Sequence, residues 1–257
     1  MISSGTKSLF CSRVEKVERL APDVFSVWIT AQAIAKKIKP GQFIGVKVPE
    51  RNDLLLRRPF SVADVQRDRL RVVFRVVGPG TEKLARSRKS DQWDILGPLG
   101  KAAPLVENRN VVVCGGGVGA APLFYLTRIL KMRNRVTVVL GAKRSSELIL
   151  TSDFRKLIGK VLVATEDGGQ GVRGLVTCLL ERVVVEIEKP VVFACGPKPM
   201  LNALSQWSEK ILIWAFLEQR MGCGTGVCYG CAVEKKDGGY FRLCQDGPVV
   251  RLNEVVL

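Results

Sequence analysis

Four cysteines near the C-terminus are spaced as Cys-x4-Cys-x2-Cys-x12-Cys. This is the spacing of a plant-type 2Fe–2S site, which carries one electron at a time. Glycines are interspersed in the same segment, where they let the backbone curl around the sulfides and leave amide N–H groups free to point at sulfur. The pattern therefore predicts an iron–sulfur cluster whose ligands are Cys223, Cys228, Cys231 and Cys244.

The fourth ligand is distant in sequence but can be close in space. Residues 231–235 and 240–244 read as two strands around Asp237-Gly238-Gly239, which is a hairpin signal. Closing the hairpin brings Cys244 back beside Cys231. Three other uses of the cysteines stay open at this point: a zinc site, two disulfides, or buried structural thiols.

Charge and composition narrow the possible partners. The 257 residues carry 40 Lys and Arg against 24 Asp and Glu, a net charge of +16, and no histidine. Such a balance attracts polyanions, but no recognised nucleic-acid motif accompanies it, so we expect dinucleotide phosphates or an acidic protein rather than nucleic acid. The missing histidine excludes Rieske ligation and histidine-based triads.

Targeting signals point to the cytoplasm. The first ten residues lack the apolar core of a signal peptide. The longest uncharged stretch, residues 111–127, is too short and too rich in glycine for a membrane span. We therefore expect a cytoplasmic protein without a membrane span.

Three segments with different hydrophobic patterns follow one another along the chain. Up to about residue 99, short apolar runs cut by turns predict a small antiparallel β-barrel, with strands at 24–30, 43–48, 61–65 and 70–77. Further along, strands alternate with helices and predict a doubly wound parallel sheet, with strands at 111–113, 136–140, 161–164 and 191–194 and helices at 123–132 and 198–210. The predicted fold is thus α+β multidomain, with a barrel (1–103), an α/β domain (104–213) and a small C-terminal loop and hairpin domain (214–257).

Two turns of the α/β segment suit a dinucleotide. The strand at 111–114 runs into Gly115-Gly116-Gly117-Val118-Gly119-Ala120, which matches G-x-G-x-x-A and would let a pyrophosphate approach a helix N-terminus. A second turn, Cys195-Gly196-Pro197, ends another strand and so lies at the same edge of the sheet, although Cys195 could equally be a structural thiol. The candidate nucleotide-binding residues are Gly115, Gly117, Ala120, Cys195, Gly196 and Pro197.

The choice between NAD and NADP stays open. NAD-specific folds often place an acid after the next strand, for the ribose hydroxyls. Here the chain reads Gly141-Ala142-Lys143-Arg144 instead.

The barrel segment holds two further phosphate-friendly pieces. Arg57 and Arg58 precede Pro59-Phe60-Ser61, and arginine forks suit a diphosphate. Gly78-Pro79-Gly80-Thr81 offers a glycine turn followed by a hydroxyl at a helix start.

Together these segments resemble the ferredoxin–NADP reductase superfamily over nearly the whole chain. Residues 58–61 are similar to its R-x-[YF]-[ST] flavin motif, and residues 115–120 and 195–197 are similar to its nicotinamide-nucleotide turns. The resemblance implies that Arg58 holds the FAD pyrophosphate and that Ser61 lies near the flavin ring. The FAD-binding residues that it implies are Arg58, Pro59, Phe60, Ser61, Val73, Phe74, Arg75, Gly80 and Thr81.

Within that superfamily, the cysteine loop and the ending at residues 244–249 are similar to the family of electron transfer subunits of type B dihydroorotate dehydrogenase, which serves pyrimidine biosynthesis. This resemblance implies an FMN-containing catalytic partner subunit, in a heterotetramer of two of each subunit. It also implies that electrons pass through the 2Fe–2S cluster and FAD to NAD+, with no catalytic side chain in this chain. Close rivals are the flavin and cluster subunits of a hydrogenase, a sulfide dehydrogenase or a ferredoxin–NAD(P) oxidoreductase. A rival of another class is a basic zinc-binding module without catalysis.

Overall fold

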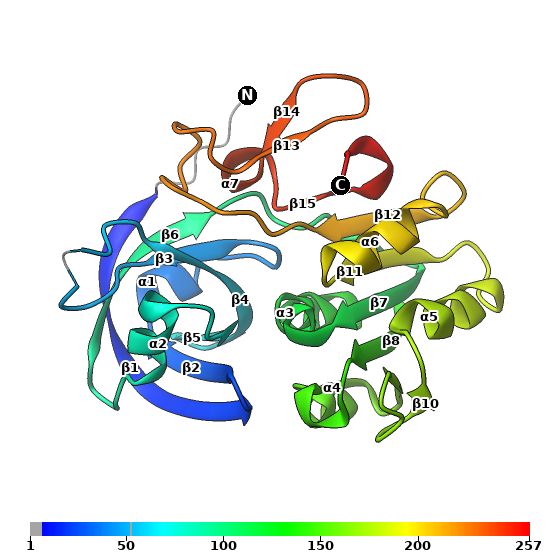
Figure 1. Cartoon of the computed structure of the whole chain (residues 1–257), viewed down its shortest axis with the longest axis horizontal. Coiled ribbons are helices and arrows are strands. Elements are labelled where there is room, and N and C mark those ends of the chain that lie inside the picture. The colour runs from blue at the N-terminus through cyan, green and yellow to red at the C-terminus, as the bar shows by residue number, and fades with distance from the viewer. Residues whose placement is uncertain (1–6, 52) are drawn as a thin grey trace.

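Six antiparallel strands close a barrel in the N-terminal third of the chain, and the computed structural model describes residues 7–51 and 53–257 (Figure 1). The strand order around the barrel is β1-β2-β5-β4-β3-β6. Two short helices lie on the connections. The elements are β1 (Ser8–Ala21), β2 (Val24–Thr30), α1 (Gln32–Ala35), β3 (Phe43–Val46), β4 (Arg58–Gln66), β5 (Arg69–Arg75), α2 (Pro79–Ala85) and β6 (Gln92–Leu99).

A seven-stranded sheet follows, in the order β10-β9-β8-β7-β11-β12-β15, and its strands are parallel except for the last. Its first part holds β7 (Asn110–Gly116), η1 (Gly117–Gly119), α3 (Ala120–Leu130), β8 (Arg135–Ala142), η2 (Ser145–Glu147), α4 (Thr151–Ile158) and β9 (Val161–Thr165). Its second part holds β10 (Val172–Arg173), α5 (Val176–Val185), β11 (Val191–Cys195), α6 (Lys198–Ser205), β12 (Leu212–Phe216) and β15 (Val249–Arg251).

Between β12 and β15 the chain leaves this sheet to form a small C-terminal unit. It consists of a long loop, the two-stranded hairpin of β13 (Ala232–Glu234) and β14 (Tyr240–Arg242), and α7 (Leu243–Asp246), and η3 (Leu252–Glu254) follows β15. Gly238 and Gly239 adopt positive φ in the hairpin turn, as the Asp-Gly-Gly sequence predicts. Cys231 and Cys244 are buried with Val233 in the core that also covers the α5 and α6 face of the sheet.

Helix α3 joins the barrel to the sheet, and Figure 1 shows it between the two. Its Tyr125 hydroxyl donates to the Ile38 carbonyl at 3.3 Å, and its Arg128 guanidinium lies 2.9 Å from the buried Asp64 carboxylate on β4. A second ion pair joins Arg71 on β5 to Asp153 on α4 at 2.7 Å. These contacts fix the orientation of the two large parts, and with it the cavity between them.

The predicted fold class is confirmed, with differences in the elements. The barrel has two strands that the apolar runs did not reveal. β1 alternates buried residues such as Val14 with exposed charges, and β6 contains Gly97-Pro98, a pair that argues against a strand in sequence. Helix α6 ends at Ser205 rather than at residue 210. Cys244 lies in α7 rather than in a strand.

The predicted boundary between residues 213 and 214 falls inside β12, and β15 returns to the same sheet. The expectation about a signal peptide concerns residues 1–10, of which the first six lie outside the described residues. Among the described residues, no helix is long and apolar enough to span a membrane.

Candidate functional site

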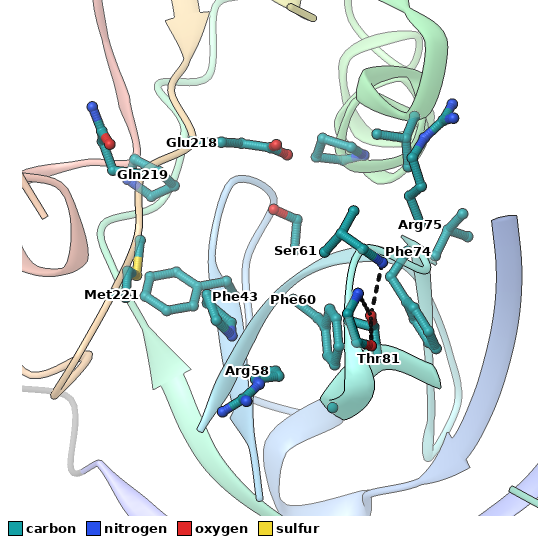
Figure 2. Close-up of a pocket in the computed structure, with 18 of the residues that line it drawn as sticks. Phe43, Arg58, Phe60, Ser61, Phe74, Arg75, Thr81, Glu218, Gln219 and Met221 are labelled. Atoms are coloured by element: carbon teal, nitrogen blue, oxygen red, sulfur yellow. Dashed lines mark hydrogen bonds between the residues drawn. The ribbon is translucent and has the colours of Figure 1, made fainter. Parts of the chain in front are cut away.

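A cavity of about 630 Å³ opens between the barrel, the first turn of the sheet and the segment after β12 (Figure 2). The barrel contributes residues from β4, β5 and the start of α2, the sheet contributes Val118 and Pro122, and the last segment contributes residues 217–219 and Met221. The structure brings together nine predicted residues in the wall of this cavity: Arg58, Pro59, Phe60, Ser61, Val73, Phe74, Arg75, Gly80 and Thr81.

The arginine of the barrel motif lies directly over the glycine of the α2 turn. A Cβ on Gly80 would stand 2.6 Å from the Arg58 Nε, so only glycine leaves room for the guanidinium in its present place. Arg58 Nη1 also donates to the Leu56 carbonyl. The half-buried guanidinium is thereby held at the cavity wall, where its remaining donors can reach a phosphate.

Thr81 shapes the turn that carries Gly80. Its hydroxyl accepts the backbone N–H groups of Val77 at 2.9 Å and Gly78 at 3.2 Å, and it donates to the Gly78 carbonyl at 3.0 Å. The side chain caps α2 from inside the helix.

The cavity floor is aromatic. Phe60 and Phe74 stack with their ring centroids 4.7 Å apart, and both line the cavity. Ser61 follows Phe60 on β4, and Figure 2 shows Glu218 extending over the cavity on the Ser61 side. A flat apolar surface with a polar rim suits an aromatic ligand with a phosphate tail.

Arg75 spans the barrel and the sheet. Its guanidinium lies 2.8 Å from the Asp23 carboxylate of the barrel and 4.0 Å from the Glu147 carboxylate of η2. The positive charge at this end of the cavity is therefore partly neutralised.

The two predicted nucleotide turns lie side by side at the carboxyl edge of the sheet. β7 and β11 pair so that Cys195 stands opposite Gly115. A Cβ on Gly119 would collide with the Cys195 carbonyl, and one on Gly115 would come within 2.9 Å of the Ala120 Cα. Gly117 has a φ of +55° and open space beside it, so its backbone can approach a ligand. The structure thus brings together Gly115, Gly117, Ala120, Cys195, Gly196 and Pro197.

Cys195 is buried in this arrangement. Only 1% of it is exposed, and burial raises its pKa well above the ordinary value, with smaller contributions from Glu218 and Cys114. Such a group can pack or donate a weak hydrogen bond but does not act as a nucleophile.

A second cavity of about 270 Å³ adjoins the first. Gly196 and Pro197 line it, and Leu217, Glu218 and Gln219 line both cavities. The segment after β12 therefore separates the barrel cavity from the second nucleotide turn.

Glu218 is a site residue that the sequence motifs did not reveal. It is an exposed residue that lines both cavities, and desolvation by the protein atoms around it raises the pKa of its carboxyl group. The sequence did contain one signal for Glu218, an acidic residue just after the parallel strand β12, because ligands bind outside the carboxyl ends of such strands.

An acidic pair at the end of β9 was also missed. Asp167 accepts the N–H of Gly169 at 2.9 Å and the N–H of Ser145 at 3.0 Å, and these backbone hydrogen bonds lower its pKa. Glu166 precedes it. NAD-specific folds often place an acid after the strand that corresponds to β8, and this chain has none there. Asp167, at the end of the neighbouring strand β9, is hydrogen-bonded to the turn that follows β8.

The cysteine loop folds its backbone amides toward sulfur. The Sγ of Cys223 accepts N–H groups from Thr225 at 3.3 Å and from Val227 and Cys228 at 3.4 Å each. The Sγ of Cys228 accepts those of Cys223 and Gly230, both at 3.4 Å. Gly224 and Gly226 adopt φ of +69° and +92°, which the curl of this loop requires.

The other two cysteines meet as the hairpin predicted. The N–H of Cys244 donates to the Sγ of Cys231 at 3.4 Å, and both residues are buried. All four cysteines are free thiols rather than disulfides. Within residues 7–51 and 53–257, no group of three or more Cys, Asp or Glu residues is arranged to hold a single metal ion.

The pKa values of Cys223 and Cys244, two of these four thiols, differ sharply. Burial opposes ionisation of Cys223, but the N–H groups of Thr225, Cys228 and Val227 outweigh it and lower its pKa to about 5. Burial, followed by the hydrogen bond with Cys231, raises the pKa of Cys244 to about 12. Closely packed thiols resist a second negative charge until a metal centre supplies positive charge. The amide-rich loop and the four free sulfurs fit an iron–sulfur cluster.

Comparisons with known proteins agree with these features. A family model described as the iron–sulfur cluster binding domain of dihydroorotate dehydrogenase B matches residues 218–256. The chain is 37% identical over 253 residues to the electron transfer subunit of dihydroorotate dehydrogenase B (NAD(+)) from Shouchella clausii, covering 95% of this chain and 96% of the relative. It is 39% identical over 250 residues to that subunit from Caldanaerobacter subterraneus subsp. tengcongensis, covering 95% and 97%.

Solved structures show the same architecture. An NADH-dependent reduced ferredoxin–NADP oxidoreductase, studied for flavin-based electron bifurcation, superposes with a TM-score of 0.88 at 32% identity, covering 95% of this chain and 89% of that one. Phthalate dioxygenase reductase superposes with a TM-score of 0.67 at 13% identity, covering 95% and 98%, and shares the fold.

Proposed function

Because the chain belongs to the family of electron transfer subunits of dihydroorotate dehydrogenase B, we propose that it passes electrons from a catalytic dihydroorotate dehydrogenase subunit to NAD+. The partner subunit would carry FMN and oxidise dihydroorotate to orotate in pyrimidine biosynthesis. The cofactors of this chain are a 2Fe–2S cluster and FAD, and we propose a heterotetramer of two of each subunit.

The observation that carries this proposal is the continuity between cavity and cluster loop. Met221 lines the cavity, and Cys223 follows two residues later. Two residues of extended chain span at most about 7 Å. A flavin in the cavity and a cluster in the loop would therefore be close neighbours, as a relay requires.

We propose that each part of the chain has one task. Residues 1–103 bind FAD, residues 104–213 bind NAD, and residues 214–257 hold the cluster. FAD, when bound, exchanges single electrons on one side and a hydride on the other. Arg58 holds its phosphates, Phe60 and Phe74 provide an apolar wall, and the turns at 115–120 and 195–197 hold the nicotinamide nucleotide.

We propose NAD rather than NADP as the nucleotide. Asp167 and Glu166 put two carboxyl groups at the carboxyl end of β9. Asp167 accepts the backbone N–H of Ser145, in the turn that follows β8. Carboxylates there accept ribose hydroxyls and repel a 2′-phosphate. The Asp167→Ser variant should narrow the preference for NAD+ over NADP+. An unchanged ratio of the two kcat/KM values would contradict this placement.

We propose a cytoplasmic location, since the four cysteine ligands must stay reduced to bind iron.

Co-expression with the candidate catalytic subunit tests the proposed function. We expect a yellow-brown complex that contains FAD, FMN and iron and that couples dihydroorotate oxidation to NAD+ reduction. A complex without cluster-dependent NADH formation would refute the proposal. Colourless protein that carries zinc would instead support a non-catalytic zinc module.

A second candidate function is a subunit of a ferredoxin–NAD(P) oxidoreductase, favoured by the TM-score of 0.88 to such an enzyme. Reduced ferredoxin in place of dihydroorotate separates the two candidates. Rapid NAD(P)+ reduction with ferredoxin, and none with dihydroorotate and the catalytic subunit, would favour the second.

A further inference from the structure

The ammonium group of Lys7 touches the cysteine segment at two points. Its Nζ donates to the Thr225 carbonyl at 3.3 Å and to the Gln245 Oε1 at 3.0 Å. Thr225 lies between the ligands Cys223 and Cys228, and Gln245 follows the ligand Cys244. One side chain at the start of the barrel thus bridges the two halves of the cysteine segment.

The two halves already pack together at this place. A Cβ on Gly226 would stand 3.2 Å from the Cβ of Gln245, so the loop and α7 are in close contact. The Sγ of Cys223 accepts the N–H of the same Thr225 whose carbonyl accepts from Lys7. Lys7 is therefore joined to a ligand sulfur through a single peptide residue.

The charge of Lys7 is not neutralised by a neighbour. Both of its acceptors are uncharged, and across residues 7–51 and 53–257 no carboxylate lies within 4.0 Å of its Nζ. Arg242 also contacts this loop, but its charge is paired. It donates to the Gly226 carbonyl at 3.1 Å, and its Nε lies 3.2 Å from the Asp246 carboxylate. Of these two cations, Lys7 is the one that adds a net positive charge beside the cysteines.

We propose that Lys7 is a positioning residue that braces the cluster loop against the barrel and whose charge favours the reduced cluster. This inference rests on the proposed function, because it requires a 2Fe–2S cluster on the four cysteines. Reduction adds one negative charge to the cluster, and a fixed positive charge nearby stabilises that state. Lys7 would thus raise the midpoint potential of the cluster and ease its reduction by the partner subunit.

Redox titration of three variants tests the proposal, followed by the visible and EPR signals of the cluster. Lys7→Gln keeps a hydrogen-bond donor but removes the charge, and Lys7→Arg keeps the charge. Lys131→Gln is the matched control, since Lys131 also donates to a backbone carbonyl, that of Leu157 at 2.7 Å, at the end of α3. We expect Lys7→Gln to lower the equilibrium constant of reduction about three- to tenfold, and tenfold is 59 mV for a one-electron couple.

A series of ionic strengths distinguishes an effect of the Lys7 charge from an effect of its side-chain shape. Lys7 is exposed, so the difference between wild type and Lys7→Gln should shrink as salt rises from about 0.01 M to 1 M. Lys7→Arg and Lys131→Gln should keep the wild-type potential. A cluster that is lost from Lys7→Gln but retained in Lys7→Arg would also support the role of the charge.

Two failures are distinguishable. Wild-type protein without an iron–sulfur signal would overturn the proposed function and this inference with it. Cluster-loaded Lys7→Gln with an unchanged potential would overturn this inference alone, as would an equal shift in Lys131→Gln.

Discussion

Replacing Gly80 by alanine should weaken FAD binding without unfolding the barrel. The new Cβ would stand 2.6 Å from the Arg58 Nε and 3.0 Å from its Nη2. The atoms in its way belong to the far end of a flexible side chain, so the guanidinium can swing aside while the backbone stays in place. The perturbation therefore displaces the proposed phosphate-binding group and little else.

The expected magnitude follows from the contact that is lost. A hydrogen bond to a charged group contributes about 1.5–3 kcal/mol, so displacing Arg58 from a phosphate should raise the Kd for FAD roughly 10- to 150-fold. Gly80 is the second residue of α2, where alanine is preferred over glycine by up to about 1 kcal/mol. Affinity should fall while stability holds or rises.

Fluorescence titration of FAD into apoprotein measures the affinity, and thermal unfolding without FAD measures the stability. The decisive control is a double-mutant cycle with Arg58→Ala. In that background the alanine at position 80 has no guanidinium to displace, so Gly80→Ala should cause no further loss. If the two losses add instead, or if Gly80→Ala leaves the Kd unchanged, Arg58 is not the group through which Gly80 acts.

Three further changes test other parts of the molecule. Cys228→Ser should abolish the iron–sulfur signal but keep FAD bound, since ligand and cavity lie in different segments; loss of both in a folded protein would contradict this. Asp153→Asn should lower the free energy of unfolding measured with urea by about 1.5–3 kcal/mol, because it removes the charged partner of the buried Arg71 and leaves that guanidinium with the neutral Ser26 hydroxyl. Glu82→Gln, in an exposed ion pair, should lower it by less than about 1 kcal/mol. Because the pKa of Glu218 is higher in the folded than in the unfolded protein, the unfolded chain loses the carboxyl proton at a lower pH. The free energy of unfolding should therefore fall as pH rises above about 4.5, and Glu218→Gln should make this pH dependence weaker.

Features encoded within a few neighbouring residues were predictable from the sequence. The glycines of the cysteine loop, the Asp-Gly-Gly hairpin and the glycine turn after β7 each determine a local conformation, and each of these turns forms as expected. The parallel pairing of β7 with β11 then brings Cys195 beside Gly115, which the alternation of strands and helices implies. Local chemistry and one rule of topology thus placed most of the candidate site.

Features that depend on distant partners were not predictable in this way. Lys7 meets Gln245 across 238 positions, and nothing near either residue signals the contact. The apolar pattern of the sequence did not reveal β1, because its outward face carries charged residues such as Glu15. In the folded barrel the Glu15 carboxylate pairs with Arg69 of β5. Glu218 has no motif of its own, and it matters because two cavities meet at its side chain.

The return of β15 to the large sheet explains why the cluster loop can hold a fixed place. The loop leaves the sheet after Phe216 on β12 and comes back at Val249, which pairs with that same Phe216. Both ends of the excursion are therefore anchored at one point of the structure rather than on a flexible linker. Leu99 of the barrel contacts the loop at Gly224, and Lys7 adds a third attachment. The separation between cavity and cysteines is thus set by the sheet and the barrel together, so the distance over which electrons pass does not depend on the motion of a separate domain.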